Sequence, residues 1–126
     1  MVRNLTRSPL PRVSWKKIKE RVLFKEYDLS LVFAGDKEMK RINRKYRQKN
    51  KPANVLSFGF GRNSGEIFLN LPLVRSEAMA AGKSLKTHII FLYIHALLHL
   101  KGFKHDTESQ LKIMRKIEKK WLKILS

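Results

Sequence analysis

The apolar residues of this chain recur with two spacings, one typical of strands and one typical of helices. Short apolar runs bounded by turn-forming residues predict strands at 29–34, 55–60 and 66–70, and residues 1–13 can add a short fourth strand. Apolar residues that return every three or four positions predict helices at 14–25, 36–46, 72–81, 84–101 and 107–125.

Residues that favour helix starts support several of these boundaries. Ser14 suits the N-cap of the first helix, and Asp36, directly after the strand-breaking Gly35, is predicted to cap the second. Thr107 and Gln110 have the spacing of a capping box, which predicts the start of the last helix.

The lengths of the connections predict how the strands pair. A turn cluster at 61–65 joins two strands closely, so strands 55–60 and 66–70 should form an antiparallel hairpin. Strand 29–34, the helix after it and strand 55–60 read as a βαβ unit, whose two strands should be parallel. The predicted fold is therefore α+β, with a mixed sheet flanked by helices, in a single domain that covers residues 1–126.

The composition adds a strong positive charge to this picture. The chain has 28 Lys and Arg against 10 Asp and Glu, which gives a formal net charge of +18. A charge of this size favours a polyanionic partner, with nucleic acid first and an anionic membrane second, over a merely solvated basic surface. The basic residues gather in three clusters, at 12–25, 37–51 and 101–123.

Other features of the sequence bear on its compartment. The chain contains no cysteine, so it has no disulfide framework and suits a reducing environment. Its first ten residues lack the apolar core of a signal peptide, and its longest apolar run, 89–100, is too short and too polar to span a bilayer. The sequence therefore predicts a cytoplasmic protein without a membrane partner.

Three of the four histidines have a spacing that suits one metal ion. His95 and His99 are four residues apart on a predicted helix, so they lie on one face. Gly102 can then turn the chain out of the helix and bring His105 back over the same point. Three imidazoles and one open position are typical of catalytic zinc, whereas closed structural zinc sites usually draw on cysteine. A lone histidine here would be an ordinary helix residue, but this spacing favours metal binding.

Two neighbouring positions narrow the chemistry. Zinc proteases with the HExxH pattern carry a glutamate general base directly after the first histidine, and this chain has Ala96 there, which argues against a zinc protease. His88 precedes His95 by seven residues, too far for a shared metal in one helix. His88 is either an ordinary helix residue or a residue near the site. In the second case it would support a metal ligand or face the substrate.

Two segments of the sequence carry a resemblance to a known family. One reads NRKYRQKNKPANVLSFGF at 43–60, the other reads HALLHLKGFKH at 95–105, and similar stretches occur at 65–67 and 77–82. Taken together and in their order along the chain, these stretches resemble the bacterial YbeY-type rRNA maturation endoribonucleases. Three positions depart from the family pattern: Ala96 where Gly is frequent, Lys104 where an acidic residue is frequent, and Asn50 where Asp is common.

The resemblance implies a fold, an activity and site residues. It implies an α+β domain with a mixed sheet, and a metal-dependent, single-strand-specific endoribonuclease that acts in rRNA maturation and ribosome quality control. Its partners would be single-stranded RNA, rRNA and the small ribosomal subunit. His95, His99 and His105 would bind one zinc ion per chain, and Arg47 would be the functional arginine of the family's Tyr-Arg segment.

Several roles stay open at the level of sequence. Arg47 is either a group that stabilises charge on the phosphate in the transition state or one phosphate-positioning cation among many. Asn54 and Ser57 either line the site or order the start of a strand. Asp106 either supports a histidine or begins the last helix. The attacking group, water or the RNA 2′-hydroxyl, is equally open.

A second class of function fits the same features. A non-catalytic RNA-binding protein of ribosome assembly, with structural zinc, would share the charge and the histidines but would bind RNA without cleaving it. Nothing in the sequence predicts an oligomeric state.

Overall fold

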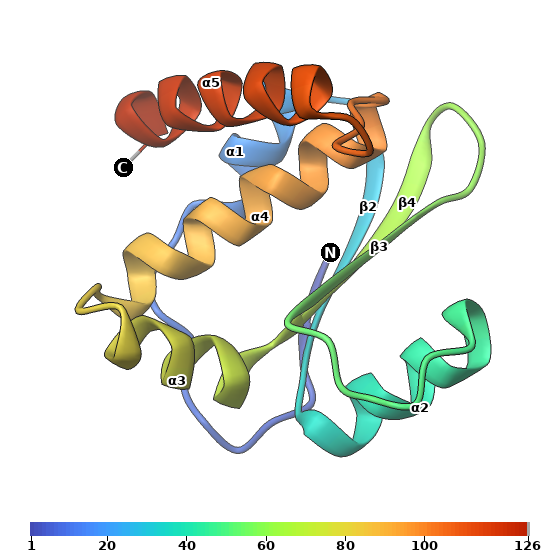
Figure 1. Ribbon diagram of the computed structural model, residues 1–126, viewed down its shortest axis with the longest axis vertical. Helices are drawn as coiled ribbons and strands as arrows, with labels where there is room; N and C mark the ends of the chain where they lie inside the picture. The colour runs from blue at the N-terminus through green and yellow to red at the C-terminus, as the bar shows by residue number, and fades with distance from the viewer. Residues whose placement is uncertain (126) are drawn as a thin grey trace.

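The structure, a computed structural model, describes residues 1–125, with side chains described through Ile124 (Figure 1). Strands and helices are interleaved along the chain, and the predicted short strand near the N-terminus is confirmed. The elements are β1 (Val2–Asn4), α1 (Trp15–Val22), β2 (Asp28–Ala34), α2 (Asp36–Arg47), β3 (Val55–Gly59), β4 (Ser64–Asn70), α3 (Leu71–Ala80), α4 (Leu85–Lys101) and α5 (Glu108–Leu125).

The described strands form one mixed sheet, in the order β1-β2-β4-β3. β1 is parallel to β2, and β2 is parallel to β4, with Asp28 beside Ser64 and Ala34 beside Asn70. β3 runs antiparallel to β4, so the predicted hairpin and the predicted mixed sheet are confirmed. The α+β class is confirmed with them.

The predicted parallel pairing of strand 29–34 with strand 55–60 is wrong. β4 lies between β2 and β3, and β3 is the edge strand. The reason is burial: Ile67 and Leu69 of β4 are fully buried, whereas most residues of β3 are only partly covered. The more apolar strand takes the interior position, and the short turn keeps β3 antiparallel beside it. The parallel connection from β2 therefore passes through α2 and β3 before it reaches β4.

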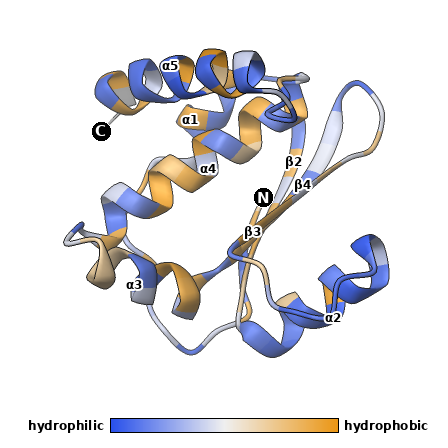
Figure 2. Cartoon of the chain, viewed as in Figure 1, coloured by the Kyte–Doolittle hydropathy of each residue, from blue (hydrophilic) through white to orange (hydrophobic). Residues whose placement is uncertain are grey.

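Helices cover the two faces of the sheet unequally. α1, α3, α4 and α5 pack on one face, where the main core joins Leu31, Phe33 and Ile67 to the apolar side chains of α4. The other face has a smaller cluster under α2, which includes Met39 and Leu56. Hydrophobic residues concentrate on the strands and α4, whereas α2 is mostly hydrophilic (Figure 2). No helix among the described residues is long and apolar enough to cross a membrane.

The main differences from the predicted helix boundaries are at the end of α1 and at the cap of α2. α1 ends at Val22, short of the predicted Lys25, because the chain folds back and the buried Lys19 ammonium donates hydrogen bonds to the carbonyls of Lys25 and Tyr27, both at 2.8 Å. Asp36 is the first residue of α2 rather than its cap, and its carboxylate accepts a hydrogen bond from the Asn70 side chain.

The predicted starts of α4 and α5 are confirmed by hydrogen bonds. The Ser84 hydroxyl accepts from the Thr87 amide at 3.1 Å and caps α4. The Thr107 hydroxyl accepts from the Gln110 amide at 3.1 Å, while the Gln110 side chain accepts from the Thr107 amide at 3.2 Å. This reciprocal pair is the predicted capping box.

Gly65 allows the end of α4 to lie directly on the hairpin. A Cβ atom at Gly65 would collide with the Tyr27 hydroxyl and would lie 3.1 Å from Leu100 Cδ2, next to His99 on α4. Its cross-strand neighbour Gly59 has room, because a Cβ there would meet only Leu100, at 3.8 Å.

Gly65→Ala should lower the free energy of unfolding by roughly 1–3 kcal/mol, the usual cost of overpacking a core position. Urea denaturation of both glycine variants measures the effect. Gly59→Ala serves as the matched control and should cost clearly less. Equal stability of the two variants would contradict the close packing of Tyr27 and Leu100 against Gly65.

Candidate metal centre

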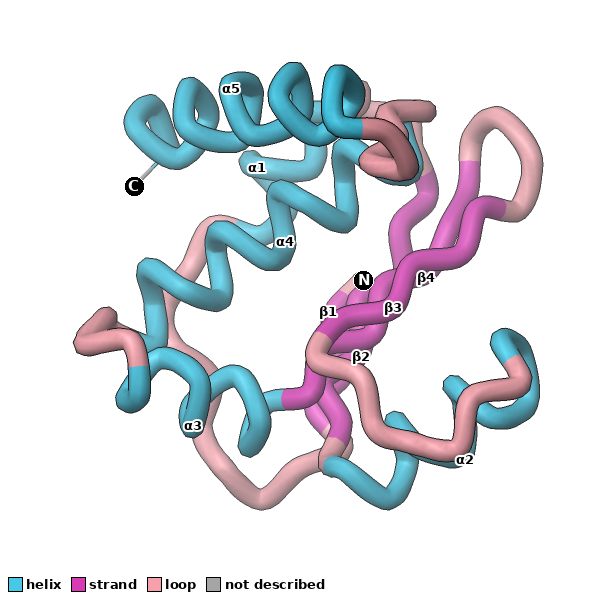
Figure 3. Tube along the Cα trace, viewed as in Figure 1, coloured by secondary structure: helices cyan, strands magenta, loops and turns pink. Residues whose placement is uncertain are grey.

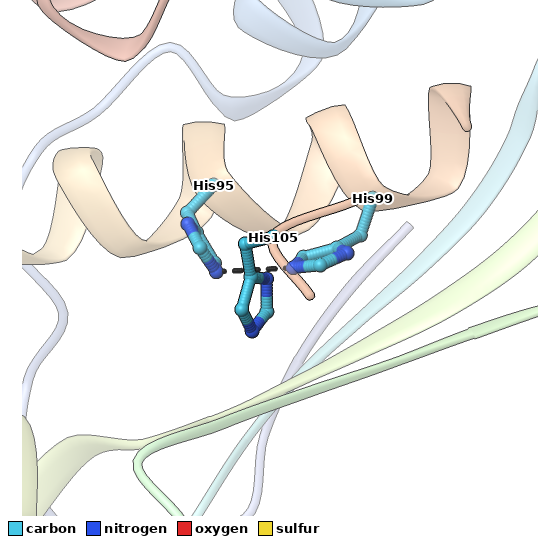
Figure 4. A group of neighbouring side chains, drawn as sticks. All are labelled: His95, His99 and His105. Atoms are coloured by element: carbon cyan, nitrogen blue, oxygen red, sulfur yellow. Dashed lines mark hydrogen bonds between the residues drawn. The ribbon is translucent and has the colours of Figure 1, made fainter. Parts of the chain in front are cut away.

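Three histidine side chains meet beside the C-terminal half of α4 (Figure 4). His95 and His99 point from the same side of the helix, as their spacing predicts. α4 ends at Lys101, and the next residue, Gly102, has a left-handed φ of 112° and donates its amide hydrogen to the His99 carbonyl at 3.0 Å. This turn brings His105 back toward the other two imidazoles.

The geometry of the cluster suits one metal ion. One ring nitrogen from each histidine lies within 4.8 Å of the other two, and the Nε2 atoms of His95 and His99 are 3.1 Å apart. The ring centroids are separated by 4.7 Å (His95–His99), 5.4 Å (His95–His105) and 4.6 Å (His99–His105). Three converging imidazole nitrogens form a donor set that suits zinc and other divalent transition metals.

Glu118 supports the cluster from α5 and was not predicted from sequence. Its carboxylate Oε2 lies 3.1 Å from Nδ1 of His95, and the residue is only 2% exposed. This contact fixes the ring and leaves Nε2 directed at the other histidines. Its sequence signal was weak: Glu118 lies four residues after Met114 and three before Trp121, on the apolar side of the helix.

Burial sets the protonation of the middle histidine. It lowers the pKa of His99, and the neighbouring imidazoles of His95 and His105 act in the same direction. The carboxylates of Glu118 and Asp106 oppose this shift. Because the shift favours the neutral imidazole near pH 7, His99 offers a lone pair rather than a proton to a cation.

A pocket of about 410 Å³ opens beside the histidines. Its other walls come from the end of α2 and from the start of β3. The loop that joins these two elements begins with a left-handed turn at Gln48 and runs back along α2 (Figure 3). Arg47, Asn54 and Ser57 all line this pocket, so the structure brings these predicted site residues together with the histidines. Ala96 lines it as well, where an HExxH protease would have its glutamate.

Arg47 lines the same pocket as the three histidines. Its side chain is exposed, and within residues 1–125 it forms no ion pair with a carboxylate. A guanidinium in this state is available for an anion that enters the pocket.

His88 lies outside the metal cluster but is connected to the pocket wall. Its Nε2 is 3.1 Å from Oε1 of Glu77 on α3, and the side-chain amide of Asn54 donates to the same carboxylate at 3.3 and 3.4 Å. The backbone carbonyl of Asn54 also accepts a hydrogen bond from the backbone amide of Asn70 at 2.9 Å. Asn54 therefore both orders the start of β3 and lines the pocket, and the two predicted interpretations are compatible.

Asp106 lies just before α5, and its backbone amide donates to the Gln110 side chain at 3.1 Å. Its carboxylate is close enough to His99 to raise the pKa of that imidazole, against the larger effect of burial. The residue thus serves the helix start and also adds a negative charge near the histidines.

Sequence comparison finds relatives of this chain that share one description. A relative from Chelativorans sp. (strain BNC1), described as Endoribonuclease YbeY, is 38% identical over 107 residues, which cover 78% of this chain and 66% of the relative. Another of the same description, from Polynucleobacter asymbioticus, is 35% identical over 133 aligned residues, covering 95% of this chain and 86% of the relative. A third, from Gluconobacter oxydans, is 40% identical, and the match spans 58% of its length.

Structural comparison supports the fold alone. The solution structure of TM1509 from Thermotoga maritima has a TM-score of 0.66 and 23% sequence identity, covering 98% of this chain and 87% of that one.

The sequence model of the family described as Endoribonuclease YbeY matches residues 9–126. This match and the relatives together show that the chain belongs to the YbeY endoribonuclease family.

Proposed function

We propose that residues 1–126 act as one endoribonuclease domain that uses a metal ion to cleave single-stranded RNA. The observation that carries this proposal is that three converging imidazole nitrogens and the exposed Arg47 line one open pocket. Family membership supports it, and so does the net charge of +18, which suits a polyanionic substrate.

The proposed cofactor is one zinc ion per chain, held by His95, His99 and His105. The donor set fits zinc, because all three ligands are imidazoles and the pocket leaves one side of the cluster open. A bound zinc ion supplies Lewis acidity toward a phosphoryl oxygen and makes water a better nucleophile at neutral pH.

The side chains divide the remaining work. Glu118 orients the His95 ring, and burial keeps His99 neutral and ready to coordinate. Arg47 is proposed as the catalytic residue that stabilises negative charge on the phosphate in the transition state, since its planar fork suits phosphate oxygens. None of the residues that line the pocket in the described part of the chain is a carboxylate, so no side chain is assigned as the general base.

The proposed biological role is rRNA maturation and ribosome quality control in the cytoplasm, with rRNA of the small ribosomal subunit as substrate. The charge supports an RNA partner, and the absence of cysteine suits a reducing compartment. The competing class, a non-catalytic assembly protein with structural zinc, is less well supported because a structural site is closed, whereas this pocket is open on one side.

Metal-replete protein should cleave labelled single-stranded RNA, leave duplex RNA intact and lose activity in EDTA. His99→Ala should lose both zinc and cleavage, because two imidazoles hold the ion poorly. His88→Ala is the matched control, since this histidine lies on the same helix but outside the cluster, and it should keep its zinc. Elemental analysis beside gel-based cleavage measures both. RNA binding without metal-dependent cleavage would identify the assembly protein instead.

Glu118→Ala should weaken zinc affinity by about 10- to 100-fold, the usual effect of removing a carboxylate that orients a metal-binding histidine. Competition with a chelating dye measures the affinity, and circular dichroism checks that the variant remains folded. Glu108→Ala removes an exposed carboxylate from the first turn of the same helix and should change nothing. Wild-type affinity in Glu118→Ala would remove its positioning role.

Arg47→Ala should lower the single-turnover cleavage rate far more than it weakens RNA binding, because a transition-state contact affects the rate first. Lys49→Ala, in the loop directly after α2, controls for the loss of one positive charge. Filter binding and single-turnover cleavage of both variants separate the two roles. If the two variants behave alike, Arg47 is only part of the basic surface.

A further inference from the structure

We propose that the face of the sheet beside α2 holds a second RNA subsite, where bases of the substrate strand stack on exposed aromatic rings. This inference rests on the proposed ribonuclease function and names where its substrate lies beyond the cleavage pocket. The subsite is a trough of about 270 Å³ beside α2, and residues of α2 and of all four described strands line it.

Aromatic rings form the floor and the rim of this trough. The rings of Tyr46 and Phe58 are 5.3 Å apart between centroids, and those of Phe58 and Phe68 are 6.1 Å apart. Tyr46 and Phe60 are each 60% exposed, although large aromatic side chains are usually well buried. Exposed rings at the rim of a hollow are the feature on which single-stranded bases stack, and every base has a flat face to offer.

The trough and the metal pocket are lined by neighbouring residues of α2 and β3. Tyr46 lines the trough, and the next residue, Arg47, lines the metal pocket. In β3, Ser57 lines the metal pocket and Phe58 lines the trough, because neighbouring residues of a strand point to opposite faces. Within residues 1–125 no strand pairs with the outer edge of β3. An RNA strand that leaves the histidines across this edge therefore arrives at the aromatic rings.

The charges that line the trough balance, and Lys45 adds a cation beside the exposed Tyr46 ring. Lys45 Nζ lies 5.2 Å from the centre of the Tyr46 ring, so a phosphate next to a base stacked there has a cation at hand. Of the two carboxylates in the trough, Glu38 pairs with Arg41, and Glu66 accepts a hydrogen bond from the Ser30 hydroxyl at 3.0 Å. Arg3 lines the trough as well and is exposed. Cations bordering an aromatic floor favour single-stranded nucleic acid over an apolar protein surface.

Alanine substitution of the exposed rings tests the subsite. Tyr46→Ala and Phe60→Ala should each weaken binding of a single-stranded oligonucleotide by about 5- to 150-fold, the range that loss of one stacked base gives. Tyr46→Trp should retain binding, because stacking needs the ring and not the hydroxyl. Phe24→Ala removes a partly exposed aromatic ring that follows α1 and does not line the trough, and it should bind as wild type does.

Two readouts separate stacking from general damage. Fluorescence of 2-aminopurine in the oligonucleotide should be quenched on binding to wild type and less so with Tyr46→Ala. The slope of log affinity against log salt should stay the same, because no charge is removed. A mononucleotide is too short to reach from the metal pocket to the trough, so it should bind the variants and wild type equally.

The two proposals can fail separately. If metal-replete wild type neither binds nor cleaves single-stranded RNA, the proposed function fails, and the subsite fails with it. If wild type cleaves RNA and both alanine variants bind long oligonucleotides as tightly as wild type, only the subsite is overturned, and the aromatic face is left for a protein partner.

Discussion

Burial of α4 between the sheet and α5 is the constraint on which the rest of this structure depends. Eight residues of the helix are buried, so its rotation about its own axis is fixed by core packing. The side that remains faces the pocket beside β3, and His95 and His99 lie on it. The imidazoles are therefore positioned before any ligand arrives, by apolar contacts distributed over the whole helix.

Carboxylates are scarce in this chain, and two of the ten acidic residues are used to hold histidines. Glu118 reaches His95 from α5, and Glu77 reaches His88 from α3, each at 3.1 Å. Only the first pair touches the three-histidine cluster. The second continues to Asn54, so it ties α3 and α4 to the point where β3 begins. α4 is thus linked to α5 on one side and, through α3, to the start of β3 on the other.

Local features of the fold were readable from the sequence, and long-range ones were not. The i, i+4 spacing of His95 and His99 and the turn at Gly102 depend only on helix geometry, so the cluster was predictable. The strand order was not, because β2 can pair with either strand of the hairpin. The choice depends on which hairpin strand has residues such as Ile67 and Leu69 that the main core buries fully. Glu118 escaped prediction for the same reason, since its partner is 23 residues away.

The edge position of β3 also bears on why the substrate would be single-stranded. The metal pocket and the aromatic trough lie on opposite sides of this strand: Ser57 lines the pocket, together with Val55 and Leu56, and Phe58 lines the trough. A chain that occupies both must bend sharply over the edge within a few nucleotides. A duplex is stiff over far greater lengths and keeps its bases stacked inside, whereas a single strand bends freely and exposes its bases. On the proposed path, selectivity for single strands follows from the order of the strands in the sheet and requires no contact that reads sequence.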